Sequence, residues 1–198
     1  EMAQTLEGKT AREIMPYLEQ ADLMLDIHAS FTKDSAPFII CSENNVKIAK
    51  IFDSDLVVTN FDSFEPGSTD YFMNLQKKPG FCFECGFLGN EKTQIIAESA
   101  IKKFLTYAGC IKSKLELKER AIKHYKLASL YKNKAAKFKT SRYFPDFERF
   151  NEKTLVGAEG DKNIYCEKGD IILFARDRES LNEECFLIAR EVFDGNFS

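Results

Sequence analysis

The chain has 198 residues, of which 44% are hydrophobic, so it can bury a substantial core, and its composition excludes a disordered protein. Its formal net charge is −3 and its basic residues are scattered among acids, which argues against binding to nucleic acid or to an anionic membrane. No apolar run approaches the roughly 20 residues of a membrane helix, and no signal-peptide pattern is present. The six cysteines show no disulfide framework and predict reduced thiols in a soluble, cytoplasmic protein.

The first predicted elements are a helix and a strand. Thr10, with an acid three residues later, predicts the start of a helix, and Pro16 predicts a kink in it. Residues 21–28 alternate in a way that is typical of a strand, because the apolar side chains fall on one face while Asp26 and His28 share the other.

Strands and helices then alternate along the chain. The patterns predict strands over 37–41, 55–59 and 80–86, and helices over 45–52, 69–76 and 91–107. The last helix is predicted to end at Gly109. This alternation predicts an α/β fold over residues 1–118, with a mainly parallel sheet sandwiched by helices.

The second part of the chain, residues 119–198, has a different pattern. Its short β-like runs are separated by polar or glycine-containing turns and cover 122–131, 137–143, 153–158, 164–167, 171–175 and 184–191. They predict a small antiparallel β-domain.

Two carboxylates and one imidazole are candidates for chemistry. His28 ends a strand of the predicted sheet, where ligands bind in α/β folds, so it is a candidate metal ligand that Asp26 would orient. Spacing alone favours a simpler interpretation, a histidine with local hydrogen bonds. Glu84 lies in an apolar strand, where a desolvated carboxylate suits proton transfer from a metal-activated water. The alternative for Glu84 is a structural ion pair with a lysine.

The remaining cysteine and histidine patterns are less informative. Cys82 and Cys85 form a Cys-x-x-Cys, but residues three apart on a strand face opposite sides, so we expect both thiols to pack as small apolar groups. His124 is flanked by lysines and is predicted to lie on the surface.

Two strand motifs resemble the succinylglutamate desuccinylase/aspartoacylase family, which belongs with the zinc metallocarboxypeptidases. Residues 22–28 are similar to the family's apolar strand that ends in Asp-x-His, and residues 79–86 are similar to its strand that ends in Glu-x-Gly. The resemblance implies a zinc carboxypeptidase-like fold, with His28 as the last of three zinc ligands and Glu84 as the catalytic carboxylate. It implies a Zn²⁺-dependent deacylase acting on a small N-acyl amino acid or peptide-like substrate.

One family feature is missing. The first two zinc ligands of the family come from an upstream His-x-x-Glu motif, and residues before Asp26 contain no histidine. We therefore expect the N-terminal part of the enzyme to be absent from this sequence, which begins with Glu1. Two rival functions stay open: a metallocarboxypeptidase acting on peptides, and a non-catalytic ligand-binding homologue without the metal. The sequence does not predict the acyl group or the oligomeric state.

Overall fold

The computed structural model describes residues 4–115 and 121–192. Its α-helices are α1 (Leu6–Gln20), α2 (Val46–Ala49), α3 (Thr69–Leu75) and α4 (Glu91–Tyr107), and short 3-10 turns cover Glu43–Asn45 and Phe61–Ser63. The strands of the α/β half are β1 (Met24–Ser30), β2 (Phe38–Cys41), β3 (Leu56–Thr59) and β4 (Gly80–Phe87). Those of the β-rich half are β5 (Lys123–Lys132), β6 (Phe138–Thr140), β7 (Glu148–Arg149), β8 (Thr154–Glu159), β9 (Lys162–Cys166), β10 (Ile171–Leu173) and β11 (Glu184–Glu191).

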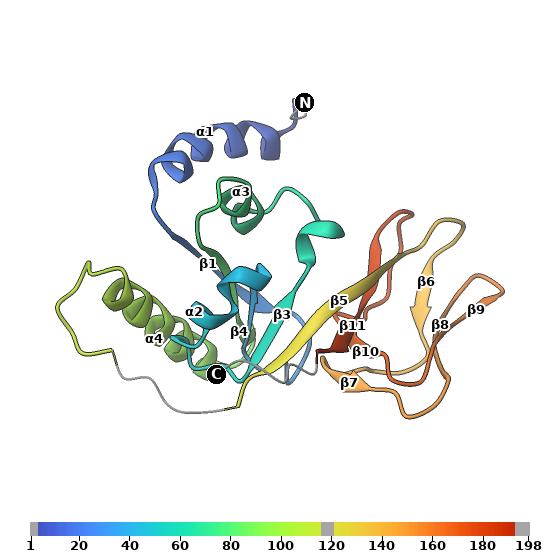
Figure 1. The fold of residues 1–198 in the computed structure, drawn as a ribbon. Coiled ribbons are helices and arrows are strands. Elements are labelled where there is room, and N and C mark those ends of the chain that lie inside the picture. Colours follow the sequence, from blue (N-terminus) through green and yellow to red (C-terminus); the bar gives the residue numbers. More distant parts are fainter. Residues whose placement is uncertain (1–3, 116–120, 193–198) are drawn as a thin grey trace.

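Within the described residues, most strands belong to one curled sheet in the order β1-β4-β2-β3-β5-β11-β10-β7 (Figure 1). Strands β6, β8 and β9 form a separate antiparallel sheet, in partial agreement with the small antiparallel β-domain predicted for residues 119–198. The other strands of that range join the large sheet. The prediction of a mainly parallel sheet holds in part: in the first half β1 pairs with β4 and β2 with β3 in parallel, but β2 and β4 pair antiparallel, so the sheet is mixed.

Strand β2 is the source of this difference. It runs parallel to β3 but antiparallel to β4. A parallel return needs a crossover of a dozen or more residues, usually with a helix, and only residues 31–37 connect β1 to β2. The chain therefore turns back, and β4 later fits between the two strands.

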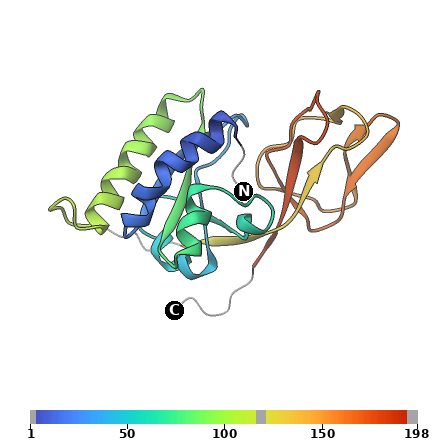
Figure 2. The same cartoon turned by 90° about the horizontal axis from the view of Figure 1, so that it is seen from above.

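Strand β5 joins the two halves of the molecule. It pairs in parallel with β3 on one side and antiparallel with β11 on the other. Figure 2 shows the helices gathered at one end and the short strands of the β-rich half at the other. The predicted boundary between residues 118 and 119 lies outside the described residues, and the division into domains 1–118 and 119–198 stays a prediction.

One face of the sheet packs against α2 and α4. Its buried side chains include Phe81, Phe83 and Cys85 of β4, which contact Phe52 and Ala100. The apolar side of β1 joins the same cluster, as the alternation of residues 21–28 predicted. Helix α4 covers the range predicted from its periodicity.

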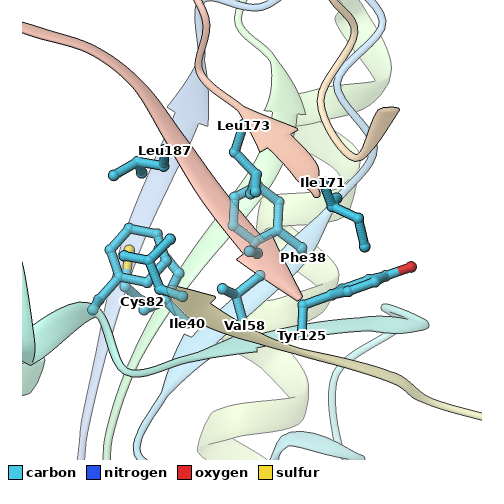
Figure 3. Packing of buried hydrophobic residues seen from close by; sticks show 11 residues of the cluster. Phe38, Ile40, Val58, Cys82, Tyr125, Ile171, Leu173 and Leu187 are labelled. Atoms are coloured by element: carbon cyan, nitrogen blue, oxygen red, sulfur yellow. The ribbon is translucent and has the colours of Figure 1, made fainter. Parts of the chain in front are cut away.

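The other face of the sheet carries a second core cluster. The sheet curls over this cluster, so strands from both halves enclose it. Phe38 lies beside Ile171 and Leu173 of β10, and Leu187 of β11 belongs to the same cluster, so strands that are distant in sequence share one core (Figure 3). Helix α3 also lies on this side, because Thr69 hydrogen-bonds to Asp26 of β1. Helices therefore lie on both faces of the sheet at β1 and β4.

Several local predictions need correction. Helix α1 begins earlier than predicted, because Thr5 is its N-cap and accepts a hydrogen bond from the Gly8 N–H, while the Thr10 hydroxyl donates to the Leu6 carbonyl inside the helix. The helix predicted over 45–52 is a 3-10 turn followed by a single turn, α2. None of the described helices is long and apolar enough to cross a membrane.

His124 is buried, so its prediction as a surface residue is wrong. It lies on β5 in the middle of the sheet, and its Nε2 lies 2.9 Å from the Thr59 hydroxyl on β3. The lysines on the same strand suggested an exposed position, but β5 pairs with β3 at His124, and this central place in the sheet buries the histidine while Lys123 and Lys126 stay exposed.

All six cysteines are free thiols, and Cys82 and Cys85 pack into clusters on opposite faces of the sheet, as predicted.

Candidate functional site

The register of two parallel strands brings the candidate residues together. His28 of β1 lies directly beside Glu84 of β4, and Asp26 lies beside Cys82. Because side chains alternate along strands, these four side chains share the sheet face opposite α4. The sequence predicted that Asp26 and His28 share one face of their strand and that Cys82 and Glu84 share one face of theirs. The parallel pairing of β1 with β4 brings the two faces together near the carboxyl ends of both strands.

Gly86 shapes the end of β4 just after Glu84. Its φ is +105°, a conformation that side chains rarely adopt, and a Cβ there would lie 3.1 Å from the Ser35 carbonyl oxygen. On β1, the register shifts between His28 and Ser30. The two strands therefore depart from regular pairing just beyond the site.

His28 is oriented by Asp26. The His28 Nε2 lies 3.2 Å from Asp26 Oδ1, and the Thr69 hydroxyl donates to Asp26 Oδ2 at 2.6 Å. The hydrogen bond with Asp26 is the main cause that raises the pKa of His28, and the same bond lowers the pKa of Asp26. Since Nε2 faces Asp26, the other ring nitrogen, Nδ1, is available to a ligand; it lies 3.9 Å from Glu84 Oε1.

Glu84 is a buried carboxyl group with an unsatisfied oxygen. The residue is 7% exposed, and its Oε2 has no hydrogen-bond partner among the described residues. Burial raises the pKa of Glu84 to about 7, the nearby His28 opposes the rise, and Asp146 and Asp26 add to it. A carboxyl group with a pKa near neutrality is suited to take up and release a proton at physiological pH.

Asp146 connects the β-rich half to the end of β1. The Ser35 hydroxyl donates to Asp146 Oδ2 at 2.6 Å, and the Phe174 backbone N–H donates to Oδ1 at 2.7 Å. Burial raises the pKa of Asp146 as well. This carboxylate therefore holds the two halves together beside Glu84 and adds negative potential there.

Glu84 opens into a cleft of about 340 Å³ between the two halves. One wall comes from the end of β1 and from Glu84, and the opposite wall comes from the β-rich half; the lining includes Ala29, Ser30, Thr32, Glu65, Tyr143, Phe174, Arg176, Glu184 and Leu187. His28 instead borders a neighbouring hollow lined by Leu88, Gly89 and Asn90 at the start of α4.

Arg176 is a candidate residue that the sequence did not reveal. It lines the cleft, its side chain forms no ion pair with the described residues, and burial lowers the pKa of its guanidinium. Glu65, which lines the same cleft, has a pKa raised to about 7 by burial and by its hydrogen bond with Glu184. Only the curl of the sheet brings Arg176 near Glu84, and no local pattern in the sequence marks it.

The donor atoms at the site are compatible with a metal ion. One ligand atom from each of His28, Cys82 and Glu84 lies within 4.8 Å of the other two. A free imidazole nitrogen and a buried carboxylate oxygen without a partner suit a cation with a bound water. If Glu84 is kept for proton transfer, however, His28 alone falls short of the three protein ligands of a catalytic zinc.

Several solved structures have a similar fold and align with most of this chain. A succinylglutamate desuccinylase from Vibrio cholerae aligns with a TM-score of 0.75 at 15% identity, over 98% of this chain and 63% of that one. A succinylglutamate desuccinylase/aspartoacylase from Rhodobacter sphaeroides aligns with a TM-score of 0.68 at 16% identity, over 98% and 66%. An aspartoacylase family protein from Mesorhizobium loti aligns with a TM-score of 0.66 at 21% identity, over 95% and 70%.

This chain has the succinylglutamate desuccinylase/aspartoacylase fold. The resemblance predicted from the two strand motifs is thereby confirmed at the level of the fold. The chain spans about two thirds of the length of these structures. No protein-family model and no curated protein matches the sequence.

Proposed function

We propose that this chain is part of a zinc-dependent hydrolase that cleaves the amide bond of an N-acyl amino acid or a similar small substrate. The observation that carries the proposal is the pair formed by His28 and Glu84: a free imidazole nitrogen lies beside a buried carboxyl group with a pKa near 7, and that carboxyl group lines a cleft. The fold shared with desuccinylases and aspartoacylases supports the same reaction class.

Each residue has a defined part in this reaction. His28 would hold zinc through Nδ1, while Asp26 fixes the ring through Nε2. A zinc ion would supply Lewis-acid polarisation of the amide carbonyl. Glu84 accepts the proton of the attacking water and delivers it to the nitrogen of the leaving amine, which breaks the C–N bond and leaves a carboxylic acid and an amino acid.

A substrate panel tests this function on the intact natural protein. We expect chelation to abolish hydrolysis of N-acetyl or N-succinyl amino acids, and about one zinc per chain to restore it, measured by amine release together with metal content. Faster cleavage of dipeptides than of acyl amino acids would instead establish the metallocarboxypeptidase. An absence of both zinc and turnover would establish the ligand-binding homologue.

Arg176 is proposed to bind the carboxylate of the substrate. Arg176 lines the cleft and forms no ion pair among the described residues, and a charged hydrogen bond to a substrate carboxylate contributes about 1.5–3 kcal/mol. We therefore expect Arg176→Ala to raise KM by about 10- to 100-fold with a smaller change in kcat, measured by steady-state kinetics.

Two controls define the role of Arg176. Arg176→Lys should recover part of the affinity, because it keeps the charge but loses the planar fork. Lys162→Ala, at an exposed position of β9 outside the cleft, should leave KM unchanged. An Arg176→Ala variant with an unaltered KM would remove this residue from substrate binding.

A further inference from the structure

Cys82 has no part in the proposed hydrolysis, yet its sulfur lies among the site residues. It lies two residues before Glu84 on the same face of β4, and β1 places His28 next to Glu84 on that face. One donor atom each from His28, Cys82 and Glu84 lies within 4.8 Å of the other two. These are a nitrogen, a sulfur and an oxygen ligand on two hydrogen-bonded strands, so the strands themselves fix their relative positions.

The charges around this thiol favour a cation. Asp70 and Glu84 are buried carboxyl groups, 3% and 7% exposed. Burial raises the pKa of the Cys82 thiol, and the negative charges of Glu84, Asp70 and Asp26 raise it further, so the potential at the sulfur is negative. Among the described residues, His28 is the basic group whose charge lowers the pKa of Glu84. Glu84 Oε2 is buried and has no hydrogen-bond partner among the described residues, so this oxygen can bind a cation.

We propose that His28, Cys82 and Glu84 form a site for a thiophilic divalent cation such as Cd²⁺ or Zn²⁺, with Cys82 as the sulfur ligand. Three protein ligands with one open position are sufficient for such a cation, and the mixed nitrogen, sulfur and oxygen set excludes Mg²⁺ and Ca²⁺, which require oxygen ligands. Binding forms the metal–sulfur bond and releases the thiol proton to solvent, without oxidation or reduction.

A cation in this site would inhibit the enzyme, a consequence that rests on the proposed function. Glu84 would bind the cation through the oxygen that otherwise accepts a proton, and the cation would compete with the zinc of the hydrolase for His28 Nδ1. The site therefore makes Cd²⁺ an inhibitor that acts through Cys82. Replacement of Cys82 removes the inhibition without removing the proton-transfer group.

The test uses Co²⁺ as a spectroscopic probe of the metal-free protein. A thiolate ligand gives an intense charge-transfer absorption in the near ultraviolet that nitrogen and oxygen ligands do not give. Cys110 is exposed, so Cys110→Ser serves as the background for every measurement. We expect the absorption in this background and in Cys85→Ser, a matched control whose thiol is also buried but packs on the opposite face.

Cys82→Ser should abolish the absorption and weaken Cd²⁺ binding by at least about 100-fold. Replacing a residue that only hydrogen-bonds to a metal ligand already weakens metal binding by about 10- to 100-fold, and the loss of the ligand itself should cost more. Since Cys82 is buried, His28→Ala at a half-exposed position provides a second variant, which should weaken Cd²⁺ binding comparably. An absorption that survives Cys82→Ser, or Cd²⁺ affinity that neither variant changes, overturns the proposal. The absorption needs no substrate, so its presence or absence is independent of whether the protein hydrolyses acyl amino acids.

Discussion

Glu84→Gln is expected to lower kcat/KM for an N-acyl amino acid by about 10²- to 10⁴-fold, the usual contribution of a positioned acid–base group. The amide of glutamine has nearly the same shape as the carboxyl group but can neither accept the proton of water nor return it to the leaving amine. The surrounding packing should be kept, because Glu84 Oε2 has no hydrogen-bond partner among the described residues. Steady-state kinetics on the intact protein, with zinc content determined in the same samples, measures the effect.

The control for this variant is Glu98→Gln on α4. Glu98 is exposed on the helix that covers the opposite face of the sheet, and it bonds only to Gln94 among the described residues. Its replacement should leave the rate unchanged. If Glu84→Gln hydrolyses the substrate at the wild-type rate with normal zinc content, Glu84 is not the proton-transfer group and the proposed mechanism is wrong.

The same carboxyl group is expected to make stability depend on pH. The pKa of Glu84 is about 7 in the folded protein, against 4.5 for an ordinary glutamate. Below pH 4.5 both folded and unfolded chains keep the proton; between pH 4.5 and 7 the unfolded chain loses it while the folded chain retains it. The unfolded state therefore binds fewer protons, and folding stability falls as the pH rises through this window, by roughly 3 kcal/mol in total.

Urea unfolding from pH 4 to 8 checks this prediction. Wild type and Glu84→Gln are compared in the presence of a chelator, so that metal binding does not contribute. Subtracting the two curves removes the titration of Asp146 and Asp70, whose pKa values are also raised by burial. The wild type should lose stability relative to the variant as the pH rises, and two parallel curves would show that Glu84 ionises normally in the folded protein.

The chemistry of the site was predictable from the sequence where it depends on alternation within single strands. Asp26 and His28 share a face because they are two residues apart on β1, and the same rule relates Cys82 to Glu84 on β4. That an imidazole and a carboxyl group belong to one site was implied by the family resemblance of the two motifs, not by alternation. The roles of these residues in catalysis remain proposals.

Features that depend on distant pairing were not predictable in this way. The antiparallel direction of β2 follows from a short connection after β1, and the burial of His124 follows from the central position of β5. Arg176 reaches the cleft because β10 and β11 curl over the face that carries Glu84. A pattern of neighbouring residues contains no information about which strands lie side by side, so these features required the tertiary structure.

The continuous ladder through β5 limits how the cleft can move. Both walls belong to strands of one hydrogen-bonded sheet, because β5 pairs with β3 on one side and with β11 on the other. Swinging the walls apart as two rigid bodies would break backbone bonds in the middle of that sheet, in contrast to enzymes whose lobes rotate about a flexible linker. We therefore expect ligand entry to depend on side chains that line the cleft, such as Tyr143 and Arg176, and not on a rotation of the two halves.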